Sequence, residues 1–312
     1  MTKHIPVLLN ETIAGLNIKP DGVYVDLTLG RGGHSKEILR RLKNGRLISF
    51  DKDETAIEES KQNLAEFSEK FTGIHDDFRN FRLDLDKLGI DKIDGLIADL
   101  GVSSPQFDDV SRGFSYKEDA VLDMRMDRRQ KLSAYDVINT YSLEDLTHIF
   151  REYGEEKFSY QIARKIMEIR KEKPIKTTLE LVDIVKACKP QKELAKKGHP
   201  AKQIFQAIRI EVNDELGALK VAVKDALESL KIGGRACFIT FHSLEDRIVK
   251  NAFAEVSKVE GTRHNVFALP TEEDEPNFKL INNKVITATE KELEINPRSK
   301  SAKLRNIERV KY

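Results

Sequence analysis

The stretch Gly22-Val-Tyr-Val-Asp26-Leu-Thr-Leu-Gly30-Arg-Gly32-Gly33-His34 decides the fold of this chain. Its first seven residues are apolar and β-branched enough to predict a strand, and the glycines that follow allow a sharp turn into a helix. Residues 35–42 have the apolar spacing of that helix, and 44–50 read as a second strand. A strand, a crossover helix and a second strand predict a parallel sheet.

The same alternation continues outward from this unit. Residues 54–67 predict a helix, and 71–75 and 93–98 predict a third and a fourth strand. From about 133 to 212 the pattern is helical without evident strands. After a further helix over 216–230, which we expect to stop at Gly233-Gly234, a strand over 235–241 resumes the α/β pattern. Strand-like residues return near 284–288 and 304–310.

The predicted fold class is therefore α/β, with a mostly parallel, Rossmann-like sheet and an inserted α-helical domain. We expect residues 1–108 to form the first part of the core, 109–212 a helical insert that serves as the RNA-recognition domain, and 213–312 the second part of the core with a basic tail. A chain of 312 residues exceeds what one compact core usually holds, which fits this division.

Composition favours a cytoplasmic protein. No apolar run approaches the roughly 20 residues that span a membrane, and the first residues lack the apolar core of a signal peptide. Cys188 and Cys237 lie in apolar surroundings, typical of small core residues in a reducing compartment. The histidines show no metal-binding spacing, so we expect no metal.

Positive charge gathers in two places. Residues 159–212 hold 13 Lys and Arg against 6 Asp and Glu, and residues 296–312 hold 6 against 1, although the whole chain carries only +1. A basic helical region and a basic tail on an otherwise acidic protein indicate a polyanionic partner. Solvated helix faces are an equally good explanation on charge alone.

The glycine-rich turn and Asp51 together indicate a ligand that contains adenosine. Asp51 ends the second strand about twenty residues after the turn, where a carboxylate accepts hydrogen bonds from ribose hydroxyls. The dinucleotide fingerprint fails, because its third glycine falls on Ser35. Asp26, before the turn, suits a ligand with an ammonium group, and Phe78, after the third strand, is placed to stack on adenine or to pack in the core.

A second loop, Asp99-Leu-Gly-Val-Ser-Ser-Pro-Gln-Phe107, follows the fourth strand. Asp99 would face the crevice at the carboxyl ends of the strands, where open α/β sheets bind ligands. The run Ser-Ser-Pro-Gln predicts a rigid turn that presents hydroxyls, an amide and carbonyls. A purely structural turn is the alternative.

Several long motifs make the chain resemble one family. They are Asp99 to Asp109, Ser111-Arg-Gly-Phe-Ser, Leu122-Asp-Met-Arg-Met-Asp127, Phe205-Gln-Ala-Ile-Arg-Ile-Glu-Val-Asn-Asp-Glu215, Phe241-His-Ser-Leu-Glu-Asp-Arg247 and Asn296-Pro-Arg-Ser-Lys-Ser-Ala-Lys-Leu-Arg305. Together they resemble those of the RsmH (MraW) family, the bacterial methyltransferases of cytosine N4 in 16S ribosomal RNA.

The resemblance covers essentially the whole chain and implies a class I S-adenosylmethionine-dependent methyltransferase. The donor would be S-adenosylmethionine, with S-adenosylhomocysteine as product, and the acceptor a cytosine of the 16S decoding region, within the small ribosomal subunit. Carried over motif by motif, the cofactor contacts would be Gly32, Gly33, His34, Asp51, Phe78, Asp99 and Gln106.

The Ser-Ser-Pro-Gln turn also resembles the (Asp/Asn/Ser)-Pro-Pro-Tyr loop of amino-methyltransferases. We therefore expect Ser104 and Pro105 to hold the target amine through a hydroxyl or a carbonyl. Gln106 replaces the aromatic residue of that loop, so stacking on the base would come from Phe107, Phe114 or Tyr116. The basic residues expected at RNA phosphates are Arg112, Arg125, Lys202, Arg209, Arg298, Lys300, Lys303 and Arg305.

Three alternatives remain open at this stage. A nicotinamide-dependent oxidoreductase is disfavoured by the broken glycine fingerprint, and a methyltransferase of DNA by the long inserted helices. A non-catalytic RNA-binding assembly factor that senses S-adenosylmethionine fits the same residues. The oligomeric state is left open, with a homodimer as one option.

Overall fold

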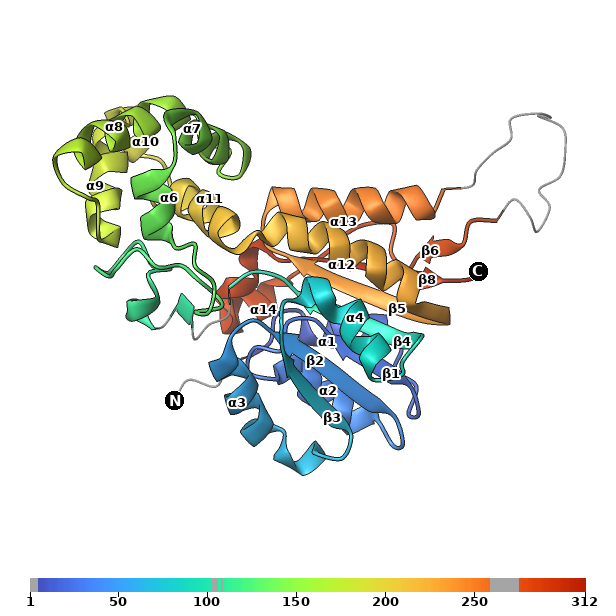
Figure 1. Ribbon diagram of the computed structural model, residues 1–312. Coiled ribbons are helices and arrows are strands. Elements are labelled where there is room, and N and C mark those ends of the chain that lie inside the picture. The colour runs from blue at the N-terminus through green and yellow to red at the C-terminus, as the bar shows by residue number, and fades with distance from the viewer. Residues whose placement is uncertain (1–4, 103–105, 108, 259–274) are drawn as a thin grey trace, which may run out of the picture. The chain divides into compact units, whose positions relative to one another are not determined.

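The computed structural model describes residues 5–102, 106–107, 109–258 and 275–312. Its internal contacts divide the chain into two compact units (Figure 1). The first joins Met1–Gly101 to Gly217–Tyr312, and the second is Val102–Leu216. The predicted insert, 109–212, lies within the second unit, and we describe each unit by itself.

The first unit is built on one mixed sheet. Its parallel strands are β1 (Val23–Asp26), β2 (Arg46–Asp51), β3 (Phe71–His75), β4 (Ile93–Asp99) and β5 (Leu230–Thr240). Strand β8 (Lys303–Arg309) runs antiparallel to β5 and pairs with the short β6 (Phe278–Leu280) and β7 (Ile286–Thr287). The order is β3-β2-β1-β4-β5-β8-β6, so the direction of winding reverses between β1 and β4. Ligands of open α/β sheets bind outside the carboxyl ends of the strands at this reversal.

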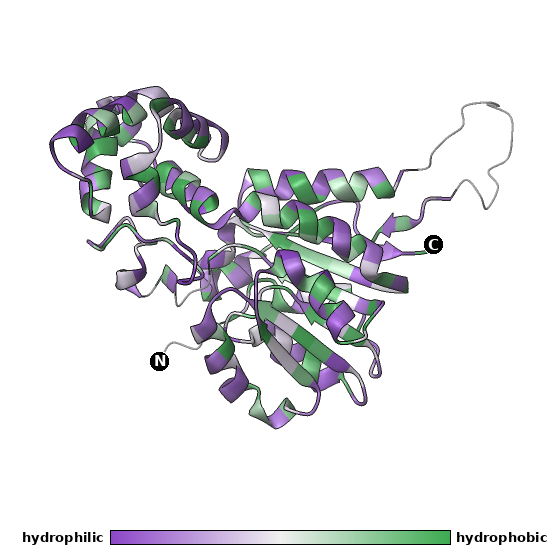
Figure 2. Cartoon of the chain, in the orientation of Figure 1, coloured by the Kyte–Doolittle hydropathy of each residue, from purple (hydrophilic) through white to green (hydrophobic). Residues whose placement is uncertain are grey.

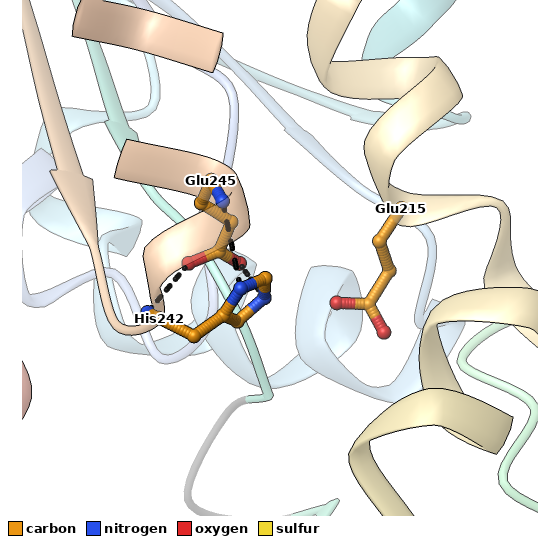
Figure 3. A group of neighbouring side chains, drawn as sticks. All are labelled: Glu215, His242 and Glu245. Atoms are coloured by element: carbon orange, nitrogen blue, oxygen red, sulfur yellow. Dashed lines mark hydrogen bonds and ion pairs between the residues drawn. The ribbon is translucent and has the colours of Figure 1, made fainter. Parts of the chain in front are cut away.

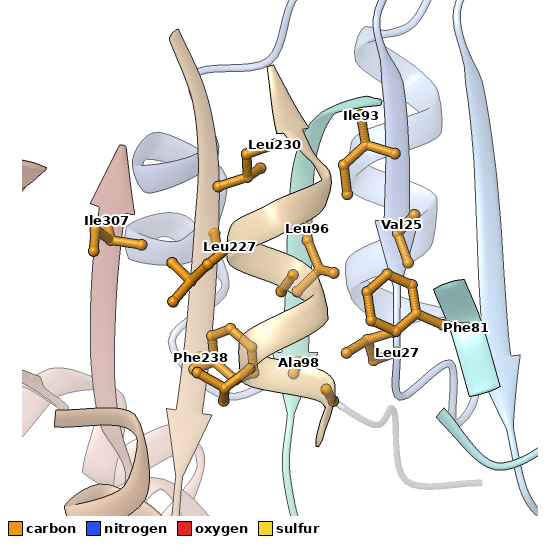
Figure 4. Packing of buried hydrophobic residues seen from close by; sticks show 14 of the residues in the cluster. Val25, Leu27, Phe81, Ile93, Leu96, Ala98, Leu227, Leu230, Phe238 and Ile307 are labelled. Atoms are coloured by element: carbon orange, nitrogen blue, oxygen red, sulfur yellow. The ribbon is translucent and has the colours of Figure 1, made fainter. Parts of the chain in front are cut away.

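Successive strand residues point to opposite faces of the sheet, and each face has its own apolar core. On one face Val25, Leu96 and Phe238 pack against α4 (Phe81–Lys87), α12 (Glu215–Ser229) and α13 (Ser243–Val256), as Figure 4 shows for part of this cluster. On the other face the neighbouring residues Tyr24, Ile97 and Cys237 pack against α1 (Leu9–Leu16), α2 (Gly33–Arg41) and α3 (Glu54–Asn63). Figure 2 shows the apolar central strands between helices that are polar on their outer sides.

Some predicted boundaries are wrong. The helix expected over 216–230 ends at Ser229, and Leu230 already pairs with Ile93, so β5 begins five residues before the predicted strand. Gly233-Gly234 lies inside β5, where a register shift absorbs the glycines. Helix α3 ends at Asn63, and a 3-10 turn, η1 (Ala65–Phe67), follows it. The remaining short elements of this unit are η2 (Phe78–Asn80), α14 (Glu290–Ile295) and η5 (Pro297–Ser301).

The second unit is helical, as the sequence predicts. It contains η3 (Val110–Arg112), α6 (Ala134–Thr140), α7 (Leu143–Glu152), α8 (Ser159–Glu172), α9 (Thr178–Ala187), α10 (Gln191–Leu194) and α11 (Lys202–Asn213) around its own core. Capping boxes at Ser133 and Thr177 start α6 and α9. In the described part of either unit, no helix combines the length and the apolar character needed to cross a bilayer.

Candidate cofactor site

Three carboxyl groups end three neighbouring strands of the first unit. Asp26 is the last residue of β1, Asp51 of β2 and Asp99 of β4, and β1 pairs with both of the others. Parallel pairing brings the carboxyl ends of these strands to one edge of the sheet. Three acidic side chains therefore gather at the point where the winding reverses, and each has a different environment.

Asp26 stabilises the loop that follows it through hydrogen bonds. Its Oδ1 accepts a hydrogen bond from the Thr28 amide at 3.0 Å, and its Oδ2 accepts one from the Ser35 hydroxyl at 2.7 Å. The side chain is almost fully buried, and burial raises the pKa of this carboxyl to about 6 despite those hydrogen bonds. Asp26 thus ties the start of the glycine-rich loop to the first turn of α2.

The glycines of this loop are required by its backbone and by its neighbours. Gly32 has a φ of +77°, which disfavours any side chain. A Cβ on Gly33 would lie 2.3 Å from Cγ of Pro6. The Ser60 hydroxyl donates to the Gly30 carbonyl at 2.7 Å, which fixes the loop from α3. The loop is held close against its surroundings and leads directly into the amino terminus of α2, where backbone amides favour anionic or electron-rich groups.

Asp51 anchors the loop and keeps acceptor capacity. Its Oδ2 accepts the Gly30 amide at 2.8 Å, and its Oδ1 accepts the Asp53 amide at 2.9 Å. Each carboxylate oxygen has a second lone pair, so both oxygens retain room for a hydroxyl donor. Burial, opposed by these two amides and reinforced by the charges of Asp53 and Asp26, raises the pKa of Asp51 to about 6. The geometry fits the two hydroxyls of a ribose.

Asp99 is the least satisfied of the three. Its backbone amide donates to the Thr28 hydroxyl at 2.6 Å, but its buried Oδ1 has no hydrogen-bond partner in the part of the chain that the structure describes. Burial first, and then the negative charges of Asp26 and Glu245, raise the pKa of Asp99 to about 8. The Asp99 side chain is 22% exposed, so a ligand can reach it, and a cationic group there would supply both the missing hydrogen bond and the balancing charge.

His34 joins this carboxyl to the amino-terminal segment. Its ring Nε2 lies 3.0 Å from the Val7 carbonyl, so that nitrogen carries a proton and donates it. The ring Nδ1 lies 3.8 Å from Oδ2 of Asp99. The side chain is only 7% exposed, and its role as a cofactor contact stays a prediction.

The predicted adenine neighbour, Phe78, lies in η2 after β3 and is partly buried. The Lys52 ammonium lies 5.9 Å from the centre of its ring and 2.8 Å from Oδ2 of Asp77. Asp77 in turn caps η2 by accepting the Arg79 amide. The Phe78 ring is thus held beside the ion pair of Lys52 and Asp77, and Lys52 directly follows Asp51 in the sequence.

Comparison with models of known protein families identifies the family of this chain. The model of the MraW methylase family matches residues 1–310. The chain belongs to the MraW methylase family. It is therefore a methyltransferase, and its sheet order and helical layers are those of the class I S-adenosylmethionine-dependent fold, as predicted.

Two solved structures align with nearly the whole chain at low identity. An rRNA methylase from Streptococcus thermophilus is 12% identical, with 100% of this chain and 99% of that chain covered and a TM-score of 0.43. SMU.1697c from Streptococcus mutans, in complex with SAH, is 13% identical, with 98% and 99% covered and a TM-score of 0.45.

Sequence reasoning missed one residue near the site of this methylase, Glu245 on α13. Figure 3 shows His242 and Glu245, which lie just after β5 and form a capping box. Oε2 of Glu245 accepts the Phe241 amide at 2.8 Å, and its Oε1 lies 3.1 Å from Nε2 of His242. Glu215, also drawn, belongs to the second unit, where it accepts two hydrogen bonds from Arg209. An acidic residue three positions after the N-cap, as Glu245 is after His242, is the sequence signal for such a capping box.

Not every predicted site residue lies in the first unit. Ser104 and Pro105 lie outside the described residues. Gln106 belongs to the second unit and is 4% exposed, so it is not brought together with Asp51 and Asp99 by the fold of the first unit alone. Its role as a cofactor contact stays a prediction.

The predicted RNA-binding side chains of this methylase fall into three groups: one that is buried, several that are paired with carboxylates, and three that are exposed. Arg112 is buried and donates hydrogen bonds to the carbonyls of Arg125 and Met126, and its role at RNA phosphates stays a prediction. The other arginines with carboxylate partners are Arg125 on Asp123, Arg209 on Glu215 and Arg305 on Asp246, the last shared with Lys303. Lys202, Arg298 and Lys300 are exposed.

Proposed function

We propose that this protein transfers a methyl group from S-adenosylmethionine to the exocyclic N4 amine of a cytosine in the decoding region of 16S ribosomal RNA. The observation that carries the cofactor part is Asp99, a partly exposed acid at the end of β4 whose buried Oδ1 has no hydrogen-bond partner among the described residues. Membership of the MraW methylase family over residues 1–310 supports the reaction class. The motifs that the sequence shares with the RsmH (MraW) family support cytosine as the base that is methylated and 16S ribosomal RNA as the substrate.

Different residues of the first unit would contact different parts of the cofactor. Asp99 would accept a hydrogen bond from the ammonium group of the methionine part, and Asp51 would accept hydrogen bonds from the ribose hydroxyls. Phe78 would pack on the adenine face. S-adenosylmethionine, when bound, supplies an electrophilic methyl group on a sulfonium.

The residues after β4 would then act on the acceptor amine. The lone pair of a cytosine amine is delocalised into the ring, so the amine must be pyramidalised and aligned with the methyl group. Ser104 and Pro105 would offer a hydroxyl and a carbonyl as acceptors for its hydrogens. The nitrogen's proton becomes acidic only as the new bond forms, so no strong base is required. Positioning supplies most of the rate acceleration.

Labelled S-adenosylmethionine tests the proposal. Small ribosomal subunits from a strain that lacks this protein are compared with their protein-free RNA, and the products are digested to nucleosides. We expect label in N4-methylcytidine from the subunits and none with the variant Asp99→Ala. Label in another nucleoside would refute the acceptor. Tight cofactor binding with no label in either substrate would refute the enzyme and favour the non-catalytic assembly factor.

A further inference from the structure

Two aromatic rings of the second unit form a parallel stack. Tyr116 and His199 have ring centroids 4.4 Å apart and an angle of 15° between their planes. Tyr116 also packs against the ring of Phe205 at 5.7 Å and 90°. Phe205 is buried on α11, whereas Tyr116 and His199 are both partly exposed. The stack therefore has a rigid base in the core and aromatic surface that reaches solvent.

The segment that carries His199 is fixed by a buried ion pair. The Lys189 ammonium donates to Glu156 at 2.6 Å and to the Pro200 carbonyl at 2.7 Å, and both side chains are nearly buried, 7% and 2% exposed. The Ala201 amide donates to Nδ1 of His199 at 3.2 Å. Burial, together with the nearby charges of Lys186, Lys117 and Lys189, lowers the pKa of His199, so the ring is neutral near pH 7.

Two exposed lysines, Lys117 and Lys186, lie near the stack. Lys117 and Lys186 both lie close enough to His199 to act on its charge, and neither forms an ion pair with any residue that the structure describes. Other lysines of this unit are compensated, as in Lys165–Glu168, Lys173–Glu180 and Lys196–Glu193. Positive charge is thus left available around the aromatic pair.

We propose that the Tyr116–His199 stack is a platform for an unpaired base of the RNA substrate, with Lys117 and Lys186 at the neighbouring phosphates. Single-stranded nucleic acid is held in this way, by aromatic faces for bases and cations for the backbone. The inference rests on the proposed function for the identity of the RNA. It assigns the second unit a binding role that is separate from the residues acting on the methyl group.

Binding measurements with matched variants test the platform. Tyr116→Leu keeps apolar volume against Phe205 but removes the aromatic face, and His199→Ala removes the second ring. A stacked base contributes about 1–3 kcal/mol, so each variant should weaken binding of unmethylated small subunits about 5- to 150-fold. Tyr116→Phe should bind like wild type. Tyr160→Leu, at a 51% exposed tyrosine of the same unit, is the control that should change nothing.

The same variants separate binding from chemistry. The KM for RNA should rise with His199→Ala, the ring of the stack that is not expected at the target base, while kcat at saturating RNA and the affinity for S-adenosylhomocysteine stay unchanged. Lys117→Gln and Lys186→Gln should each reduce the salt dependence of binding by about one phosphate contact. Folding is checked by the thermal midpoint of each variant.

Three results would overturn the platform: wild-type affinity in folded Tyr116→Leu and His199→Ala, equal losses with Tyr160→Leu, or a fall in kcat with KM unchanged. The last would mean that Tyr116 acts on the reacting base. Failure of the proposed function is distinguishable, because wild-type protein would then bind the subunits in a Tyr116-dependent manner without methylating them.

Discussion

The raised pKa of Asp99 leads us to predict a bell-shaped dependence of cofactor affinity on pH. The pKa of this carboxyl is raised to about 8, and it is proposed to bind the ammonium group of the cofactor. S-adenosylhomocysteine carries that ammonium but no sulfonium, so it isolates this contact. Binding needs Asp99 ionised and the ligand amine protonated, and free α-amino groups have a pKa of roughly 8. The association constant should therefore follow a bell with its maximum near pH 8.

The rise of the association constant on the acid side of the bell is set by two fractions, that of ionised Asp99 and that of protonated ligand amine. At pH 6.5 about 3% of Asp99 is ionised and nearly all of the amine is protonated, whereas at pH 8 about half of each group is in the required form. The product of the fractions rises about 8-fold, or about 1.2 kcal/mol. This window lies above the pKa of about 6 of Asp26 and Asp51, which limits their contribution.

Titration calorimetry at a series of pH values measures the effect. Asp99→Asn should bind more weakly at pH 8 and lose the acid limb, while the alkaline limb from the ligand amine remains. 5′-Methylthioadenosine, which lacks the ammonium group, should bind wild type without that 8-fold rise. A flat profile for wild type, or an unchanged acid limb in Asp99→Asn, would refute the assignment of Asp99 to the ammonium.

The ligand-free protein gives an independent readout of the same pKa. A carboxyl whose folded pKa is raised binds its proton more tightly in the folded state, so its contribution to stability is lost as pH rises through about 8. Between pH 7 and pH 9 the Asp99 contribution falls by about 1.4 kcal/mol, which lowers the thermal midpoint by about 3–5 °C. Asp99→Asn should lack this part of the decline. Equal declines in both proteins would contradict the raised pKa.

Two further predictions concern the second unit. Lys189→Met leaves the Glu156 carboxylate buried alone and should lower the free energy of unfolding by about 3–5 kcal/mol in urea titrations, and adding Glu156→Gln should recover part of that loss. Gly113 has a φ of +69°, and a Cβ there would lie 2.3 Å from the Val121 carbonyl oxygen. Gly113→Ala should therefore cost more than about 2 kcal/mol, whereas the control Gly89→Ala in the first unit, at a φ of +68° with nothing within 4 Å of the added Cβ, should show only the roughly 1 kcal/mol of backbone strain. Equal costs at the two glycines would show that the contact with Val121 is relieved without penalty.

The sheet was predictable from the sequence because its signals are local. Strands β1, β2, β3 and β4 are short apolar runs bounded by turn residues, and their predicted positions agree with the structure to within a few residues. The boundary between α12 and β5 failed for a physical reason. Gly233-Gly234 reads as a helix stop followed by a loop, but pairing of Leu230 with Ile93 extends the strand through the glycines.

The environments of the site residues were not predictable in the same way. The sequence places Asp26, Asp51 and Asp99 at strand ends. Only the packing shows that both oxygens of Asp26 accept hydrogen bonds, from Thr28 and Ser35. It also shows that Oδ1 of Asp99 has no partner among the described residues. The burial of Arg112 was unpredictable for a related reason. A charged residue in a loop reads as exposed, and its burial depends on the carbonyls that Arg125 and Met126 provide.

Charge counting has the same limit, and this bears on how the protein would recognise RNA. Arg305 looks available in the basic tail, but both it and Lys303 are bound to Asp246 on α13, and Arg209 is bound to Glu215. A compensated arginine contributes little to the release of counterions on which RNA affinity depends, because its charge is already balanced. Lys117 and Lys186 carry no such partner among the described residues, although neither stands out in the sequence. The salt dependence of binding should therefore follow the uncompensated lysines of the second unit more closely than the density of basic residues along the chain.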